Sequence, residues 1–179
     1  SLRANAKNFA DNDIIEMINY SHKIGKRIYI ALNIYLLPDE TALFIEKLKF
    51  IETVKPDGII VSDLGALYLA KKHSPSIPIH ISTQANTTNQ YAVSMYKELG
   101  VKRIVLAREL TIDNIKRIRD FIPDIELETF IHGAMCIAYS GRCILSAYMT
   151  KDGLGRRKKD CDIPIRSANR GDCSHSCRW

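Results

Sequence analysis

The chain has no cysteine before Cys136, and all five of its cysteines lie between that residue and Cys177. An odd, clustered set of thiols is typical of metal or redox chemistry rather than of a disulfide framework. No apolar run approaches the roughly 20 residues that cross a bilayer, and the start, SLRANAKNFADND, lacks the apolar core of a secretory signal. We therefore expect no membrane partner and a cytoplasmic protein, with a secreted protein as the alternative if a leader precedes this stretch.

Several familiar motifs are also absent. No strand-like run is followed by G-x-G-x-x-G, which argues against a dinucleotide-binding sheet. The chain has no H-E-x-x-H, and AYSGRC is not the G-x-S-x-G elbow of serine hydrolases. A cysteine peptidase would have to pair His132 with Cys136 or Cys143, for which proximity in the sequence is the sole support.

What is present is the balance of an ordinary globular protein, with 46% hydrophobic and 26% charged residues among 179. That length gives one domain or a large part of a bigger one. The formal net charge of +6 favours an anionic partner, most commonly nucleic acid, although a solvated lysine-rich surface gives the same sum. The run GRRKK at 155–159 contributes to this charge and is more typical of a solvated loop than of a phosphate site.

Strand-like and helix-like patterns alternate up to residue 133. Runs rich in Ile, Val and Thr predict strands at Arg27–Ile34, Asp57–Asp63, Ile77–Thr83, Arg103–Leu110 and Ile125–Gly133. Apolar residues spaced by three and four positions predict helices at Asn12–Lys23, Asp39–Val54, Gly65–His73, Asn89–Leu99 and Ile112–Phe121. Thr111 is expected to cap the last helix, and Gly25 and Gly100 are expected to follow helix ends.

This alternation predicts parallel strands joined by right-handed crossovers. An open doubly wound sheet and a (β/α)8 barrel share the pattern, but a barrel needs eight strands and usually ~250 residues. We predict an α/β protein with a TIM-barrel-like (β/α)8 catalytic domain, present as a fragment without its first and last strands. Residues 1–133 would supply the β/α repeats, and 134–179 a cysteine-containing region of the same domain.

Polar residues stand at the carboxyl ends of all five predicted strands, where the chemistry of either architecture is found. Each one alone is more often a loop or capping residue, but the repetition favours a site. In HISTQAN, alternation would direct Ser82, Gln84 and Asn86 the same way if the strand continues, as a row suited to a polar organic molecule. The full set is Asn33, Ser62, Asp63, Ser82, Gln84, Asn86, Arg108, Glu109 and His132.

The cysteines form two pairs and one outlier. Cys136 and Cys143 are seven positions apart, close to two helical turns, and Cys173 and Cys177 are four apart in CSHSC. Four thiolates satisfy either a tetrahedral zinc site or a [4Fe-4S] cluster. The spacing differs from the C-x2-C pairs of common zinc ribbons, and Cys161 fits neither pair.

The segment ETFIHGAMCIAYSGRCILSAYM, followed by RSANRGDCSHSCRW, closely resembles the signature region of peptidase family U32, the collagenase-like family. VSDLGAL, PIHISTQANTTN and RIVLARELT resemble the same family in the same order, so the resemblance covers nearly the whole chain. It implies a TIM-barrel-like domain truncated at both ends. It also implies either a peptidase acting on polypeptides or a hydroxylation protein acting on a tRNA uridine, a ribosomal cytidine or ubiquinone.

For the hydroxylating members the resemblance implies a [4Fe-4S] cluster on four cysteines and a hydroxyl group associated with prephenate. Carried over by motif, the ligands are Cys136, Cys143, Cys173 and Cys177. The fourth ligand is the least fixed, because the inserted KDGLGRRKKDCDIPI brings in Cys161 and because relatives can take a last ligand from further downstream.

The prediction is therefore an iron-sulfur-dependent RNA hydroxylation protein, acting on tRNA rather than rRNA with a small carboxylate such as prephenate. Arginine suits that carboxylate because its planar fork binds two oxygens at once. A collagenase-like peptidase and a zinc-stapled binding module are the alternatives. The predicted catalytic residues are His132, Arg108 and Glu109, and the predicted substrate-binding residues are Asn33, Asp63, Ser82, Gln84, Asn86 and Arg142.

Overall fold

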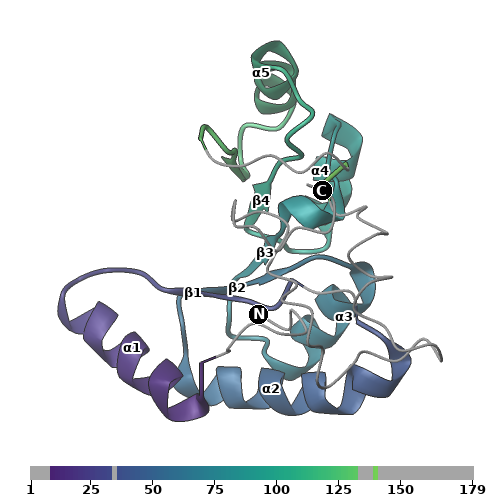
Figure 1. The fold of residues 1–179 in the computed structure, drawn as a ribbon. Helices are drawn as coiled ribbons and strands as arrows, with labels where there is room; N and C mark the ends of the chain where they lie inside the picture. Colours follow the sequence, from purple (N-terminus) through teal and green to yellow (C-terminus); the bar gives the residue numbers. More distant parts are fainter. Residues whose placement is uncertain (1–8, 34–35, 133–138, 141–179) are drawn as a thin grey trace, which may run out of the picture.

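The computed structural model describes residues 9–33, 36–132 and 139–140, in which strands and helices alternate as the sequence predicts (Figure 1). The strands are β1 (Tyr29–Ala31), β2 (Gly58–Val61), β3 (Ile79–Ile81), β4 (Arg103–Val105) and β5 (Glu126–Glu128). The α-helices are α1 (Asp11–Lys23), α2 (Thr41–Val54), α3 (Leu64–His73), α4 (Gln90–Glu98) and α5 (Ile112–Phe121). Two 3-10 helices complete the described elements, η1 (Pro38–Glu40) and η2 (Thr83–Ala85). No helix in these ranges is long and apolar enough to cross a membrane.

The five strands form one parallel sheet whose order, β1-β2-β3-β4-β5, is their order in the chain. A doubly wound sheet reverses its order at a switch point, and no reversal occurs among the described strands. Right-handed crossovers between successive neighbours place every connecting helix on the same side of the sheet. One face is therefore packed under helices, and the carboxyl ends of all five strands share one edge.

The helix-covered face holds the apolar core. Alternate strand residues, such as Ile59 and Val61 of β2 and Ile81 of β3, are 0–1% exposed and pack in one cluster with helix side chains. Burying such a side chain contributes roughly 1.5–3 kcal/mol to folding. The helix residues of this cluster that are most completely buried include Phe44, Leu48, Ile51, Leu67, Val93 and Ile118.

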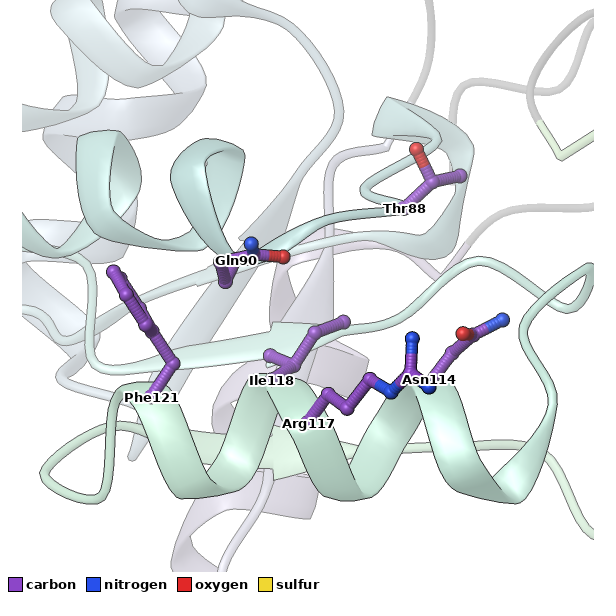
Figure 2. Close-up of a pocket in the computed structure, with 6 residues that line it drawn as sticks. All are labelled: Thr88, Gln90, Asn114, Arg117, Ile118 and Phe121. Carbon is purple, nitrogen blue, oxygen red and sulfur yellow. The ribbon is translucent and has the colours of Figure 1, made fainter.

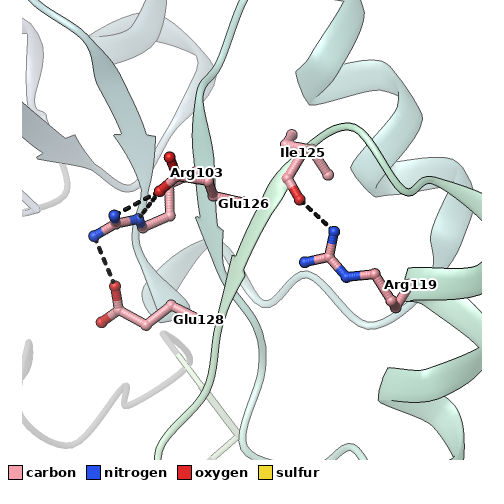
Figure 3. Close-up of polar contacts among 5 residues, drawn as sticks. All are labelled: Arg103, Arg119, Ile125, Glu126 and Glu128. Carbon is pink, nitrogen blue, oxygen red and sulfur yellow. Dashed lines mark hydrogen bonds and ion pairs between the residues drawn. The ribbon is translucent and has the colours of Figure 1, made fainter.

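The opposite face carries a charged network near the amino ends of the strands. Arg103 binds the Glu126 carboxylate through Nε (2.7 Å) and Nη2 (2.5 Å) and reaches Glu128 through Nη1 at 3.4 Å (Figure 3). Its guanidinium also lies 5.2 Å from the ring centre of Tyr29, which is 4.9 Å from that of His80. Burial, and then the charge of Arg103, lower the pKa of His80 below its ordinary value. The network joins β4 to β5, and the charge of Arg103 adds to burial in disfavouring the protonated form of His80.

Local capping signals explain the helix boundaries. The Thr111 hydroxyl accepts a hydrogen bond from Asn114 N at 3.2 Å, which confirms the predicted cap of α5. Gly25 and Gly100 follow helix ends with φ of +67° and +81°, as predicted. The expected start of the second helix at Asp39 was too early, because Pro38–Glu40 forms a 3-10 turn and the α-helix begins only at Thr41.

The strands are shorter than the sequence suggested. β3 ends at Ile81, and η2 follows at once, so the strand does not continue and the alternation that would have directed Ser82, Gln84 and Asn86 the same way does not apply. Asn86 closes this turn in the left-handed region, with φ of +54°, which a continuing strand does not allow. The proposed boundary between residues 133 and 134 lies in the stretch 133–138, outside the described residues, so that division stays a prediction.

Candidate functional site

Several of the predicted site residues lie together at the carboxyl ends of the strands. We call this end of the sheet its carboxyl edge, and the site there the strand-edge site. Ser82, which follows β3 and is 3% exposed, accepts hydrogen bonds from Asn33 Nδ2 at 3.3 Å and from Gln84 N at 3.2 Å. Asn33 follows β1 and Ser82 follows β3, so this contact passes over the carboxyl end of β2, which lies between those two strands. The Asn33 side-chain amide, the Ser82 hydroxyl and the Gln84 backbone N–H therefore form one connected group.

Two further predicted residues present buried oxygen atoms at the same edge. Asp63 caps α3 by accepting a hydrogen bond from Ala66 N at 2.8 Å through Oδ1. Its Oδ2, the Oδ1 of Asn86 and the hydroxyl of Thr87 are buried and have no hydrogen-bond partner among the described residues. Buried polar atoms are costly to leave unsatisfied, so we expect each of these atoms to gain a partner from water, from the rest of the chain or from a bound molecule.

The most densely bonded part of the edge follows β4, where Glu109 and Arg108 both contact Ser140. The Ser140 backbone N donates to Glu109 Oε1 at 2.8 Å, and its hydroxyl donates to Oε2 at 3.1 Å. The same hydroxyl oxygen accepts from Arg108 N at 3.3 Å and from Arg108 Nε at 3.4 Å. Ser140 is 0% exposed, so a residue 31 positions further along the chain is locked onto the end of β4.

The same contacts set the charge state of Glu109. Partial burial works to raise the pKa of this carboxyl, although the residue as a whole is exposed, but the hydrogen bonds from Ser140 and the charge of Arg108 outweigh it and hold the pKa below its ordinary value. Thr83 extends the group toward β3, because its hydroxyl donates to Leu106 O at 3.0 Å and lies 3.5 Å from that of Ser140. This end of the sheet thus holds a carboxylate and a guanidinium that both contact Ser140.

The remaining predicted residues do not join this group. His132 is exposed after β5. Arg142 and the four predicted metal ligands Cys136, Cys143, Cys173 and Cys177 lie outside the described residues, so their roles stay predictions. Within the ranges that the structure describes, no three His, Cys, Asp or Glu side chains gather in a way that would hold a metal ion.

Sequence reasoning missed two members of the site, Thr83 and Ser140. Thr83 was overlooked because strand alternation pointed to Ser82 and Gln84 on either side of it. Ser140 was considered in AYSGRC only as a hydrolase nucleophile, and that motif was rejected. Its position between two cysteines of the signature segment was the signal available, but its partner Glu109 is remote in the sequence.

Fold and site together define a parallel α/β protein with a polar, charge-bearing site at the carboxyl edge of its strands. That is the placement of active sites in α/β enzymes generally. A sequence model of the family described as Peptidase family U32 matches residues 1–179, so the chain belongs to that family.

Curated relatives of this chain carry two kinds of name. It is 38% identical over its whole length to tRNA hydroxylation protein P of Escherichia coli strain K12, and spans 36% of that protein. It is 37% identical, over 98% of its length and 24% of the relative, to the 23S rRNA 5-hydroxycytidine C2501 synthase of the same strain. A relative from Methanocaldococcus jannaschii, 39% identical over 99% of this chain and 40% of the relative, is named an uncharacterized protease.

A solved structure supports the fold. The U32 peptidase Mk0906 superposes with a TM-score of 0.58 at 16% sequence identity, over 70% of this chain and 53% of that one. The likeness at this identity concerns the fold alone. The chain thus covers little more than a third of the length of the tRNA-hydroxylation relative and about half of the solved one.

Proposed function

We propose that this chain carries the strand-edge site of an RNA hydroxylation protein that acts on a tRNA uridine in the cytoplasm. The proposal is supported by relatives named for tRNA and rRNA hydroxylation, which align along nearly the whole chain. The net charge of +6 suits an RNA partner. Since the chain spans only part of those relatives, the activity would belong to a longer protein.

The architecture proposed for that protein is a TIM-barrel-like (β/α)8 domain. Five parallel strands in chain order, joined without reversal, are the arrangement from which such a barrel is built. The charged network of Arg103 would then lie inside the barrel near its amino end. The group around Ser140 would lie at the opposite end, where barrel enzymes bind their substrates.

The observation that carries the functional proposal is the burial of Ser140 against Glu109 and Arg108. Ser140 lies four positions after Cys136 and three before Cys143. At 3.8 Å between successive Cα atoms, the two cysteine Cα atoms can lie no more than about 15 and 11 Å from that of Ser140. A cofactor held by these cysteines would therefore be close to the polar groups of the strand edge.

The cofactor proposed is a [4Fe-4S] cluster held by Cys136, Cys143, Cys173 and Cys177, with zinc as the alternative. Four thiolates are a donor set that either centre accepts. A cluster would supply a site that binds or activates a small oxygen-donating molecule. This chain's own residues would orient that molecule and the RNA around it.

Arg108 is the residue proposed to bind a carboxylate such as that of prephenate. Its contacts with the described residues use the backbone N and Nε, which leaves Nη1 and Nη2 for a ligand. Glu109 would orient Arg108 and the cysteine segment rather than exchange protons, because Ser140 donates to both of its oxygens. Asn33, Ser82 and Gln84 would supply neutral hydrogen bonds to substrate.

Mass spectrometry of tRNA nucleosides tests the proposal in cells. A strain without the full-length gene should lack hydroxylated uridine, and a wild-type copy should restore it. A copy with Cys136→Ala should not restore it, whereas protein abundance, checked by immunoblot, should be unchanged. Normal hydroxylation in the deletion strain would refute the proposed function.

A peptidase is the second candidate, because the family and one relative carry that name. The described site offers it little, since the Ser140 hydroxyl is fully buried and contacts a carboxylate and a guanidinium rather than an imidazole. Gelatin and unfolded polypeptides, incubated with the full-length protein with and without chelator, are the appropriate assay. Turnover there, with no change in RNA, would favour the peptidase.

A further inference from the structure

A groove between α4 and α5 is a second candidate binding feature, distinct from the strand-edge site. It has a volume of about 380 Å³ and lies in the helical layer, with α5 on one side and the start of α4 on the other (Figure 2). Ile118, which is 2% exposed, lies at the buried side of this groove. The residues that line it are Thr88, Gln90, Asn114, Arg117, Ile118 and Phe121.

Arg117 gives the groove a cation that no described residue neutralises. Its side chain forms no ion pair or hydrogen bond with the residues that the structure describes. By contrast, Arg103 is held by Glu126 and Arg119 by the carbonyl of Ile125 (Figure 3), and on the same helix Lys116 pairs with Asp120. The guanidinium of Arg117 is therefore available to an anion, and its fork matches the geometry of a phosphate.

Aromatic surface lies at the other end of the groove. The ring of Phe121 is 5.6 Å from that of Tyr91, at an interplanar angle of 66°. The two residues are 55% and 65% exposed. An edge-to-face pair leaves ring faces uncovered, and an uncovered ring face is the surface on which single-stranded nucleic acids stack their bases.

Neutral hydrogen-bonding groups also line the groove. Figure 2 shows Gln90 and Thr88 across the groove from α5, and Asn114 beside Arg117 on α5 itself. Amides and hydroxyls of this kind bind the edges of unpaired bases and the 2′-hydroxyl of ribose. A free phosphate ion would not use the aromatic face, and an apolar peptide would not use the cation, so the combination favours a nucleotide.

The groove also adjoins the candidate site. Thr88 directly follows Thr87, whose carbonyl oxygen accepts a hydrogen bond from Ala107 N at 3.0 Å at the end of β4. From this we infer that the α4–α5 groove binds single-stranded RNA that flanks the nucleotide at the strand edge, with a phosphate on Arg117 and a base on Phe121. This inference rests on the proposed RNA-directed function, and it adds a second surface that would contact the RNA.

The direct test is binding of a fluorescent single-stranded oligoribonucleotide of about 12 nucleotides to the full-length protein. Arg117→Gln should weaken binding about five- to tenfold near 0.1 M salt and reduce the slope of log K against log salt by about 0.7. Phe121→Leu should weaken it at least about fivefold, with little change in that slope. Lys49→Gln on α2 and Tyr68→Leu on α3 are the matched controls, and both should bind within about twofold of wild type.

Melting curves establish whether each variant retains its fold, so that a loss of affinity reports on the groove. Equal affinities of the groove variants and the controls would overturn the inference, and so would a failure of the wild-type protein to bind the oligonucleotide. Tighter binding of an acidic peptide than of RNA would also overturn it. If the groove variants lose RNA binding while a deletion strain keeps its hydroxylated uridine, the groove stands and the proposed hydroxylation fails.

Discussion

At the scale of single residues, Ser140 and Glu109 make a contact whose strength depends on pH. The pKa of Glu109 is held below its ordinary value, mainly by hydrogen bonds from Ser140 that overcome the effect of partial burial. The unfolded chain therefore takes up the proton at a higher pH than the folded chain. The resulting stabilisation is fully present above the unfolded-state pKa and is lost as the pH falls through the folded-state pKa.

Ser140→Ala should raise the pKa of Glu109 toward its ordinary value, because the hydroxyl donor is removed while the backbone N–H remains. The substitution should also destabilise the fold by roughly 0.5–1.5 kcal/mol, the net contribution of a hydrogen bond, because Glu109 is exposed and water can replace the lost donor. Carbon-13 NMR titration of Glu109 and urea unfolding at several pH values measure the two effects. Ser74→Ala is the control, because that serine is equally buried but donates to a helix carbonyl, Ala70 O, at 3.0 Å. An unchanged pKa of Glu109 would contradict the assignment.

The pKa of His80 offers a second residue-scale test, in which two substitutions should shift it in opposite directions. Its pKa is lowered first by burial and then by the charge of Arg103, whereas the charge of Glu126 acts to raise it. Arg103→Met should therefore raise the pKa of His80, and Glu126→Gln should lower it. Proton NMR titration of the His80 ring gives both values, with Glu128→Gln as the control expected to have the smaller effect. Shifts of the same sign in the two variants would show that the network is arranged differently.

At the scale of elements, the start of α4 depends on one side chain. Asn89 Oδ1 accepts hydrogen bonds from Tyr91 N at 3.1 Å and Ala92 N at 3.0 Å. Asn89→Ala should lower the free energy of unfolding by about 1 kcal/mol, whereas Asn89→Asp should retain most of it because aspartate caps as well. Urea unfolding measures both. An equal loss in the two variants would mean that the amide nitrogen of Asn89, rather than its capping oxygen, stabilises the fold.

The elements were predictable from the sequence where their causes are local. Apolar spacing and the cap at Thr111 are properties of a few neighbouring residues, and the helices lie close to where these signals put them. The ends of the strands were not predictable from the sequence, because a strand stops where its pairing with a neighbour stops, as β3 does at Ile81. The contact of Ser140 with Glu109 was also unpredicted, since it exists only after β4 and a segment 31 residues away have been brought together.

At the scale of the whole molecule, the two faces of the sheet and the carboxyl ends of its strands have three different roles. The helix-covered face supplies the apolar stability, and the opposite face holds the ionic network of Arg103. Polar groups that an apolar core could not accommodate, including the buried oxygens of Asp63 and Asn86, lie instead at the carboxyl edge.

The cofactor of the full-length protein is the whole-molecule prediction to test. Protein purified without oxygen should contain about four iron and four sulfide per chain, and single Cys136→Ser or Cys143→Ser variants should lose most of both. Cys161→Ser is the matched control and should keep them, because Cys161 belongs to neither cysteine pair. Loss of iron in Cys161→Ser together with its retention in Cys177→Ser would move the fourth ligand to Cys161. One zinc without sulfide would instead favour a structural or hydrolytic centre, and the RNA-hydroxylation proposal would lose its cofactor.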